Sequence, residues 1–170
     1  SSDAAAALRL ANEKLASPLD AERLHEIAAG LGADVPFFLT RGSQLGTGDG
    51  SDLETVDLPN DYVVLLLLPG DASKVSTADV YAAFTGEDGF EERRAELHAS
   101  LEVRDLAALP PNDLASSPLA RELRVAGAFR ADVSGAGPAV YGLFADGEQA
   151  ALASERFADR CTTWLTAPAW

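Results

Sequence analysis

Apolar side chains recur at helical spacing over the first part of the chain. Between Asp3 and Ala16 they fall on one side of a predicted helix, and most of them are alanines. A second stripe predicts a helix that begins at Ser17-Pro18, a cap followed by proline, and stops at Gly30 or Gly32. Its inward positions are Leu24, Ile27, Ala28 and Leu31. We therefore expect a helical hairpin.

The next segments are shorter and less regular. A compact apolar stretch from Asp34 to Leu39 begins with an acid, and residues 42–50 are rich in glycine. The positions Leu53, Val56 and Leu58 favour a strand that flanks a hairpin. A continuous apolar run over 62–69 then has strand length and no polar side, which predicts a strand buried on both faces and the start of a new core.

Helices and strands alternate in the remainder of the chain. The Ser-x-x-Asp spacing of residues 76–79 predicts a capped helix over 77–84, and residues 91–101 a charged, exposed helix. After a break at 110–113, further predicted elements are a helix capped by Ser117-Pro118 with Leu119, Leu123 and Ala126 inward, strands at 131–134 and 139–144, a helix from Asp146 to Ala158, and a strand at 161–165. This order describes an α+β fold, with helices on one face of a mostly antiparallel sheet.

Composition narrows the range of functions. The net charge of −14 and the scattered placement of 13 Lys and Arg residues argue against nucleic-acid binding. The single Cys161 cannot form an internal disulfide, and two distant histidines lack metal-ligand spacing, so a reducing, cytoplasmic setting fits best. The apolar runs are too short to cross a membrane. Because Lys14 and Lys74 are the only lysines, a polyanionic ligand needs backbone amides, helix ends, arginines or a metal.

Two polar groups in the first part of the chain are candidates for chemistry. Ser1, Ser2 and Asp3 stand at the amino end of the alanine-rich helix, where free N–H groups and the helix dipole favour phosphate. The same residues also serve as ordinary helix caps. Asp34 precedes large apolar residues, and its carboxylate could position or accept the proton of a hydroxyl group; a second helix cap is the alternative.

Two further candidates lie in the second part of the chain. The turn Ser134-Gly135-Ala136-Gly137-Pro138 can cradle an anion or simply join two strands. Thr77 and Tyr81 stand one turn apart on a predicted helix and could hold a planar base, although tyrosine on an amphipathic helix is more often part of the core.

Taken in order, these segments resemble the GHMP kinases. Residues 1–5 are similar to the end of the family's Gly-Gly-Gly-Ser-Ser-x-Ala-Ala phosphate motif, and 134–138 to its Ser-Gly-Ser-Gly-Pro motif. The segments Leu-Gly-Ala-Asp-Val-Pro at 31–36 and Ser-Thr-Ala-Asp-Val-Tyr at 76–81 resemble those of the diphosphocytidyl-methylerythritol kinase branch. The match covers nearly the whole chain.

The resemblance implies an ATP- and Mg²⁺-dependent kinase that phosphorylates the 2-hydroxyl of CDP-methylerythritol in non-mevalonate isoprenoid synthesis. It makes Asp34 the catalytic carboxylate, assigns Ser1, Ser2 and Asp3 to ATP phosphates, and gives Ser1 a magnesium contact. The residues it places at the substrate are Thr77, Tyr81, Gly135, Ala136 and Gly137. It divides the chain into the end of an ATP-binding domain at 1–60 and a carboxyl-terminal domain at 61–170.

Departures from the family pattern are also informative. The glycines before the two serines, the lysine that pairs with the catalytic aspartate and the residues that grip the two bases are not in this sequence, so we expect little activity from the 170 residues alone. The first segment of such a kinase could be cleaved, disordered or a separate chain. Ala136 replaces a serine, and residues 46–49 differ from the family's Glu-Gly-Ile-Gly-Glu. Alternatives are another GHMP substrate, such as mevalonate-type alcohols, homoserine or a sugar, and a non-catalytic module.

Overall fold

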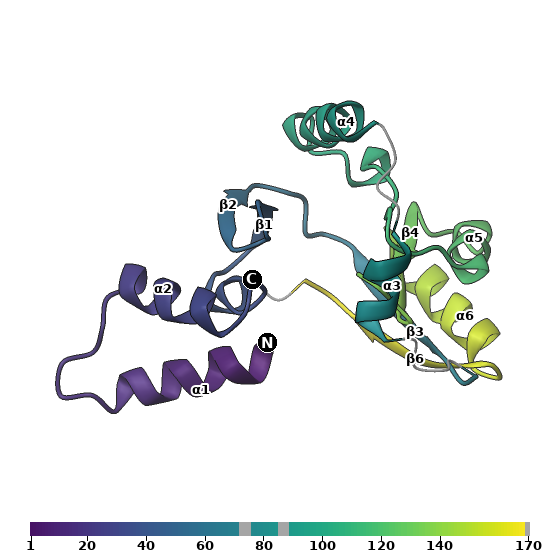
Figure 1. Ribbon diagram of the computed structural model, residues 1–170. Coiled ribbons are helices and arrows are strands. Elements are labelled where there is room, and N and C mark those ends of the chain that lie inside the picture. Colours follow the sequence, from purple (N-terminus) through teal and green to yellow (C-terminus); the bar gives the residue numbers. More distant parts are fainter. Residues whose placement is uncertain (72–75, 85–88, 169–170) are drawn as a thin grey trace. The chain divides into compact units, whose positions relative to one another are not determined.

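The structure, a computed structural model, describes residues 1–71, 76–84 and 89–168, which fall into two compact units (Figure 1). The first unit is Ser1–Asp57, and the second begins at Leu58. Each unit has its own core and is described separately. The assignment of the two parts to an ATP-binding domain and a carboxyl-terminal domain stays a prediction.

Two helices and a hairpin make up the first unit. It contains α1 (Ser2–Glu13), α2 (Ala21–Leu31), the short 3₁₀ helix η1 (Pro36–Leu39) and the antiparallel strands β1 (Ser43–Thr47) and β2 (Asp52–Val56). The predicted helical hairpin is present, because α1 packs against α2. The side chain of Asn12 fixes the connection by accepting a bond from the N–H of Leu19 at 2.7 Å and donating to its carbonyl at 3.2 Å.

The start of α2 differs from the prediction. Asp20, not Ser17, is its cap, since the Asp20 carboxylate accepts a bond from the N–H of Arg23 at 2.9 Å. Gly32 ends the helix as expected. Leu31 was predicted to face inward but is 59% exposed, whereas Ala28 is fully buried. The inward stripe is therefore narrower than the pattern indicated, because Ala28 packs against small residues of α1.

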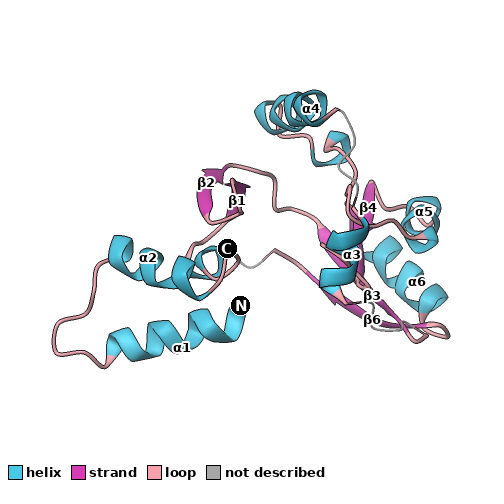
Figure 2. Ribbon diagram, in the orientation of Figure 1, coloured by secondary structure: helices cyan, strands magenta, loops and turns pink. Residues whose placement is uncertain are grey.

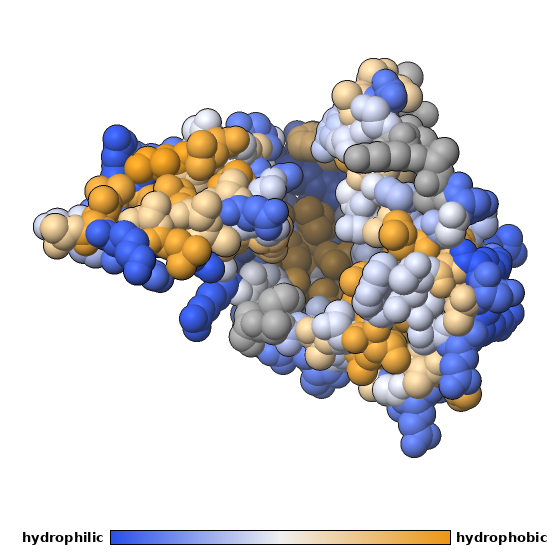
Figure 3. All heavy atoms as spheres, turned by 90° about the horizontal axis from the view of Figure 1, so that it is seen from below, coloured by the Kyte–Doolittle hydropathy of each residue, from blue (hydrophilic) through white to orange (hydrophobic). Residues whose placement is uncertain are grey.

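Apolar side chains gather on the surface of this unit in the view of Figure 3. The buried cluster is small and consists of Ala5, Ala28 and Val35, with Ala4, Leu8 and Leu39 partly buried around it. The large apolar side chains that remain exposed are Leu10, Leu15, Leu19, Leu31, Phe37 and Phe38. The unit thus buries only part of its apolar surface within itself.

A four-stranded antiparallel sheet forms the centre of the second unit, in the order β4-β5-β3-β6. The strands are β3 (Val63–Pro69), β4 (Arg130–Val133), β5 (Val140–Phe144) and β6 (Cys161–Thr166). The helical elements are α3 (Thr77–Ala83), α4 (Phe90–Glu102), η2 (Leu106–Ala108), α5 (Pro118–Val125) and α6 (Gly147–Phe157). Helices α5 and α6 pack on the sheet, as Figure 2 shows. The predicted α+β class is confirmed.

The main core lies between this sheet and helices α5 and α6. Leu65 and Leu67 of β3 are fully buried there, together with Phe144 and Phe157. The expectation that β3 is buried on both faces was wrong, because Leu68 is 36% exposed. In β3 the side chains alternate between the helix-covered face and a more open one.

Side-chain caps begin two of these helices where the sequence indicated them. The hydroxyl of Ser117 accepts a bond from the N–H of Leu119 at 3.3 Å, and the carboxylate of Asp146 accepts one from the N–H of Glu148 at 3.0 Å. Ser76 precedes α3, but its side chain makes no capping bond, so the predicted capping box is not formed. Among the described residues, no helix is long and apolar enough to cross a bilayer.

Candidate functional site

The amino-terminal turn of α1 presents polar groups that the fold does not use. Ser1 stands at the cap position but makes no side-chain cap bond, and Ser1, Ser2 and Asp3 are all exposed. The N–H of Ala5 is already bonded to the carbonyl of Ser1 at 3.0 Å, which begins the helix. The hydroxyls are therefore available to a ligand, and the N–H groups of the first turn give this end a positive potential.

Asp34 lies in the same unit, at the turn between α2 and η1. The next residue, Val35, is 2% exposed and belongs to the buried cluster that includes Ala5 of α1. Because Val35 packs against the beginning of α1, the backbone at Asp34 is held near that end of the helix. Asp34 itself is exposed and lies outside this buried cluster. Burial falls on Val35 and Pro36, so Asp34 turns to the surface.

The donors at the start of α1 suit magnesium but cannot hold it alone. Hydroxyl and carboxylate oxygens, which Ser1, Ser2 and Asp3 supply, are the hard ligands that Mg²⁺ prefers. No group of three or more His, Cys, Asp or Glu side chains that could hold a metal occurs among the described residues. A magnesium ion here would need most of its octahedral ligands from phosphates and water, as is usual for nucleotide-bound Mg²⁺.

The segment 46–49, where the sequence departs from the family pattern, forms the tight end of the β1–β2 hairpin. Asp49 accepts bonds from the hydroxyl of Ser51 at 2.7 Å and from its N–H at 3.0 Å. The Ser51 hydroxyl is the main reason that the pKa of Asp49 is lowered from 3.8. In this structure Asp49 therefore stabilises a turn.

In the second unit, the glycine turn, residues 134–138, connects β4 to β5. The N–H of Ser134 donates to the carbonyl of Ala139, and the N–H of Gly137 donates to that of Ser134, both at 2.9 Å. Gly135 and Gly137 have φ values of +55° and +79°, in the region that favours glycine. The turn borders a pocket of about 300 Å³ that Ser116 and Ser117 also line.

Sequence reasoning missed the polar network that supports this turn. Arg130 and Asp132 of β4 are 8% and 6% exposed, and their side chains lie 3.5 Å apart. Arg130 also donates to the backbone carbonyls of Leu109 and Pro110, and Asp132 accepts a bond from the N–H of Asn112 at 3.0 Å. The signal available in the sequence was a pair of opposite charges, Arg130 and Asp132, at the beginning of the strand predicted over 131–134.

Helix α3 carries the two residues predicted to hold a base. Thr77 is exposed, and Tyr81 is 58% exposed, so Tyr81 is not a core residue of the second unit. The alternative that a tyrosine on this helix serves the core is thus wrong. An aromatic ring that is exposed in this way is available for stacking. Lys74, which precedes this helix, lies outside the described residues.

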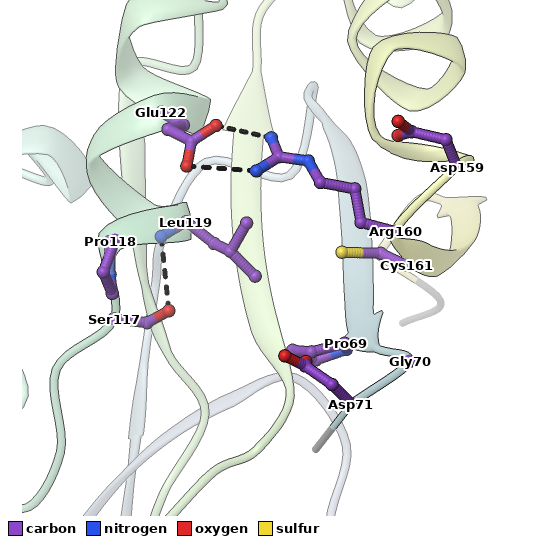
Figure 4. A pocket seen from close by; sticks show the side chains of 10 residues that line it. All are labelled: Pro69, Gly70, Asp71, Ser117, Pro118, Leu119, Glu122, Asp159, Arg160 and Cys161. Carbon is purple, nitrogen blue, oxygen red and sulfur yellow. Dashed lines mark hydrogen bonds and ion pairs between the residues drawn. The ribbon is translucent and has the colours of Figure 1, made fainter.

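A second, larger pocket of about 600 Å³ lies between β3, α5 and β6 (Figure 4). Glu122 and Arg160 form a two-point ion pair at 2.5 and 3.4 Å across its rim. The bond from Arg160 lowers the pKa of Glu122, and the same pairing raises the pKa of Arg160. The Cys161 thiol points into the pocket, and burial raises its pKa.

Part of the second unit is similar to a known protein family. Residues 88–163 match the family described as GHMP kinases C terminal. Over 180 aligned residues the chain is 36% identical to the 4-diphosphocytidyl-2-C-methyl-D-erythritol kinase of Geobacter sulfurreducens, covering 98% of this chain and 61% of that protein. It is 34% identical to the kinase of the same name from Prosthecochloris aestuarii, with 92% and 59% coverage.

Solved structures agree with the sequence relatives. A crystal structure of 4-(cytidine 5'-diphospho)-2C-methyl-D-erythritol kinase superimposes with a TM-score of 0.75 at 26% identity, covering 97% of this chain and 63% of that one. A homoserine kinase from Cytophaga hutchinsonii has a TM-score of 0.65 at 17% identity and shares the fold. The chain thus spans about three fifths of the length of the relatives that it matches.

Proposed function

We propose a function for this chain from the premise that it belongs to the GHMP kinase family. The protein from which it comes is an ATP-dependent kinase that phosphorylates the 2-hydroxyl of 4-diphosphocytidyl-2-C-methyl-D-erythritol, a step of non-mevalonate isoprenoid synthesis. The observation that carries the proposal is the 36% identity to a kinase of that name along 98% of this chain. A cytoplasmic setting accords with the single cysteine.

Each candidate residue has a part in this reaction. Ser1, Ser2 and Asp3 would hold ATP phosphates and the magnesium ion, with Ser1 as a direct ligand. Magnesium would neutralise charge that develops on the phosphates during transfer. Asp34 would orient the acceptor hydroxyl and take its proton. Phosphoryl transfer passes through a loose transition state, so this placement and the surrounding donors supply most of the catalysis.

The second unit would bind the substrate. Tyr81 would stack on the cytosine with Thr77 beside it, which accords with the exposure of both residues on α3. The N–H groups of Gly135 to Gly137 would face the phosphates and the reacting part of the substrate. Short glycine-rich backbone is suited to this role because it lets a phosphate approach closely.

A substrate panel tests the proposal. The complete product of the gene that encodes this chain is incubated with ATP, Mg²⁺ and one alcohol at a time: CDP-methylerythritol, mevalonate, homoserine or a sugar. We expect turnover on CDP-methylerythritol at about 1–100 s⁻¹, the usual range for kinases. Preference for another alcohol would show that the chain comes from a GHMP kinase with a different substrate. No turnover on any of the alcohols would favour a non-catalytic module.

Two further measurements sharpen this test. Tyr81→Ala should weaken binding of cytidine diphosphate, whereas Phe84→Ala, which removes another exposed aromatic ring near the end of the same helix, should not. The 170-residue chain alone should phosphorylate substrate far more slowly than the complete product. The reason is that neither Lys14 nor Lys74 can be assigned the role of the family's lysine that pairs with the catalytic aspartate. Equal loss of cytidine binding in both variants would argue against stacking by Tyr81.

A further inference from the structure

We propose that Asn112 is a positioning residue for the glycine turn, and that it sets the direction in which the N–H of Ala136 points. The turn's part in binding phosphate belongs to the proposed function, on which this inference rests. The role of Asn112 comes from its own contacts, since it lies in the loop after η2, 23 residues before its partner Gly135 in the sequence.

The carboxamide of Asn112 is fully engaged. Its Nδ2 donates to the carbonyl of Gly135 at 2.7 Å and to that of Val133 at 3.0 Å, which uses both of its hydrogens. Its Oδ1 accepts a bond from the N–H of Leu114 at 2.8 Å. Only this orientation of the amide satisfies two carbonyls and one N–H, so the side chain is locked in one direction.

The backbone of Asn112 is fixed independently. Its N–H donates to the carboxylate of Asp132 at 3.0 Å, and Asp132 is 6% exposed and paired with Arg130. Arg130 in turn holds the preceding carbonyls of Leu109 and Pro110. Removal of a partner from such a buried charged network lowers the stability of the fold. The network therefore holds the loop, and with it the carboxamide of Asn112, in a fixed position.

Because the carboxamide of Asn112 is fixed, it also sets the orientation of the peptide group that it contacts in the turn. In a trans peptide the C=O and the following N–H point in opposite directions. The bond between Gly135 and Ala136 is trans, and its carbonyl is drawn toward Asn112. The N–H of Ala136 therefore points away from Asn112, outward from the supporting loop.

Neither that N–H nor the N–H of Gly135 donates to a protein group within the described part of the chain. Successive unbonded N–H groups that point to the same side of a turn can bind an anion. Without the bond from Asn112, the peptide group between the two residues can rotate, because Gly135 permits several backbone conformations. Asn112 thus holds the turn in the conformation that exposes both donors.

The test compares three variants of the 170-residue chain. Asn112→Ala removes the carboxamide without adding charge, and Asn112→Asp keeps the bond to Leu114 but replaces the donating nitrogen with an oxygen. Asn60→Asp makes the same chemical change at an exposed loop position and serves as the control. Amide signals of Gly135 and Ala136 are followed by NMR while inorganic pyrophosphate is added.

We expect both signals to shift in the wild type and in Asn60→Asp. In both Asn112 variants the dissociation constant should rise about tenfold, equivalent to about 1.4 kcal/mol. The proposal would be overturned if pyrophosphate left the amide signals of Gly135 and Ala136 unshifted in the wild type. It would also be overturned if the Asn112 variants bound pyrophosphate as tightly as the wild type does. Loss in Asn112→Asp alone would also overturn it, because added charge would then be the cause.

Kinetics of the complete gene product give the second readout. Asn112→Ala should lower kcat/KM for CDP-methylerythritol about tenfold. The urea midpoint of each variant is measured in parallel. A purely structural role predicts a lower midpoint with unchanged kcat/KM in the folded protein, which would contradict positioning. If the wild type phosphorylates none of the alcohols, the proposed function fails, and the pyrophosphate titration still decides the role of Asn112.

Discussion

The two glycines of the glycine turn provide a prediction whose size follows from the structure. Gly135 and Gly137 both have positive φ, so alanine at either position takes a conformation that costs an L-residue about 1–2 kcal/mol. Their surroundings differ. A Cβ added at Gly135 meets nothing within 4 Å, whereas one added at Gly137 lies 3.2 Å from Cγ1 of Val133. Val133 is 5% exposed and has little room to move.

Gly137→Ala should therefore destabilise the second unit more than Gly135→Ala. Backbone strain alone predicts a loss of about 1–2 kcal/mol for Gly135→Ala. For Gly137→Ala the crowding of a packed strand residue adds a further cost of about 1–3 kcal/mol. The expected difference between the two variants is this second contribution, and it does not depend on the strain that they share.

Urea unfolding measures the difference. With Trp170 replaced by Phe, emission reports Trp164 in β6 and so follows the second unit. The two variants and the parent chain should unfold with equal m values and with midpoints in the order parent, Gly135→Ala, Gly137→Ala. Equal midpoints for the two variants would refute the reasoning, because Val133 would then accommodate the new methyl group freely.

Three further outcomes follow from packing and charge. Leu67→Ala should cost about 2–5 kcal/mol and Leu68→Ala far less, because Leu67 is fully buried and Leu68 is 36% exposed; similar urea midpoints would contradict this. The bond from Arg160 lowers the pKa of Glu122, so the stability linked to this pair is present above pH 4.5 and is lost as pH falls through the lowered pKa. Glu122→Gln should then reduce the dependence of the midpoint on pH below 4.5, and an unchanged profile would count against the pairing. Burial raises the pKa of Cys161, so a thiol reagent should label it slowly at pH 8 in the native chain and rapidly in urea, and fast native labelling would contradict its burial.

Local patterns in the sequence were sufficient for most elements of the fold. Helix caps at Ser117 and Asp146 and the apolar run of β3 were each identified from neighbouring residues, and the structure contains them. Failures arose where a choice depended on tertiary packing. Ser17 and Asp20 are both suitable caps, and the bond from Asn12 to Leu19 determines where the chain can turn into α2.

The candidate site was harder to predict, for the same reason. Ser1, Asp34 and the glycine turn are visible as motifs, because backbone and helix-end chemistry requires particular residue types at short spacing. Asn112 has no such signature. Its role depends on hydrogen bonds to the carbonyls of Val133 and Gly135, more than twenty positions further along the chain. No local sequence pattern predicts these contacts. The exposure of Asp34 likewise follows from which neighbour, Val35, packs against α1.

The carboxylate of Asp34 is the direct test of the account, because the proposed reaction assigns the acceptor hydroxyl to it. In the complete gene product, Asp34→Asn keeps the size of an exposed side chain, so stability should be nearly unchanged. The rate of phosphate transfer to CDP-methylerythritol at saturating ATP should fall by about 10²–10⁴-fold. Asp52→Asn, an exposed carboxylate of β2 in the same unit, should leave it unchanged. A transfer rate for Asp34→Asn equal to that of the wild type would contradict the account.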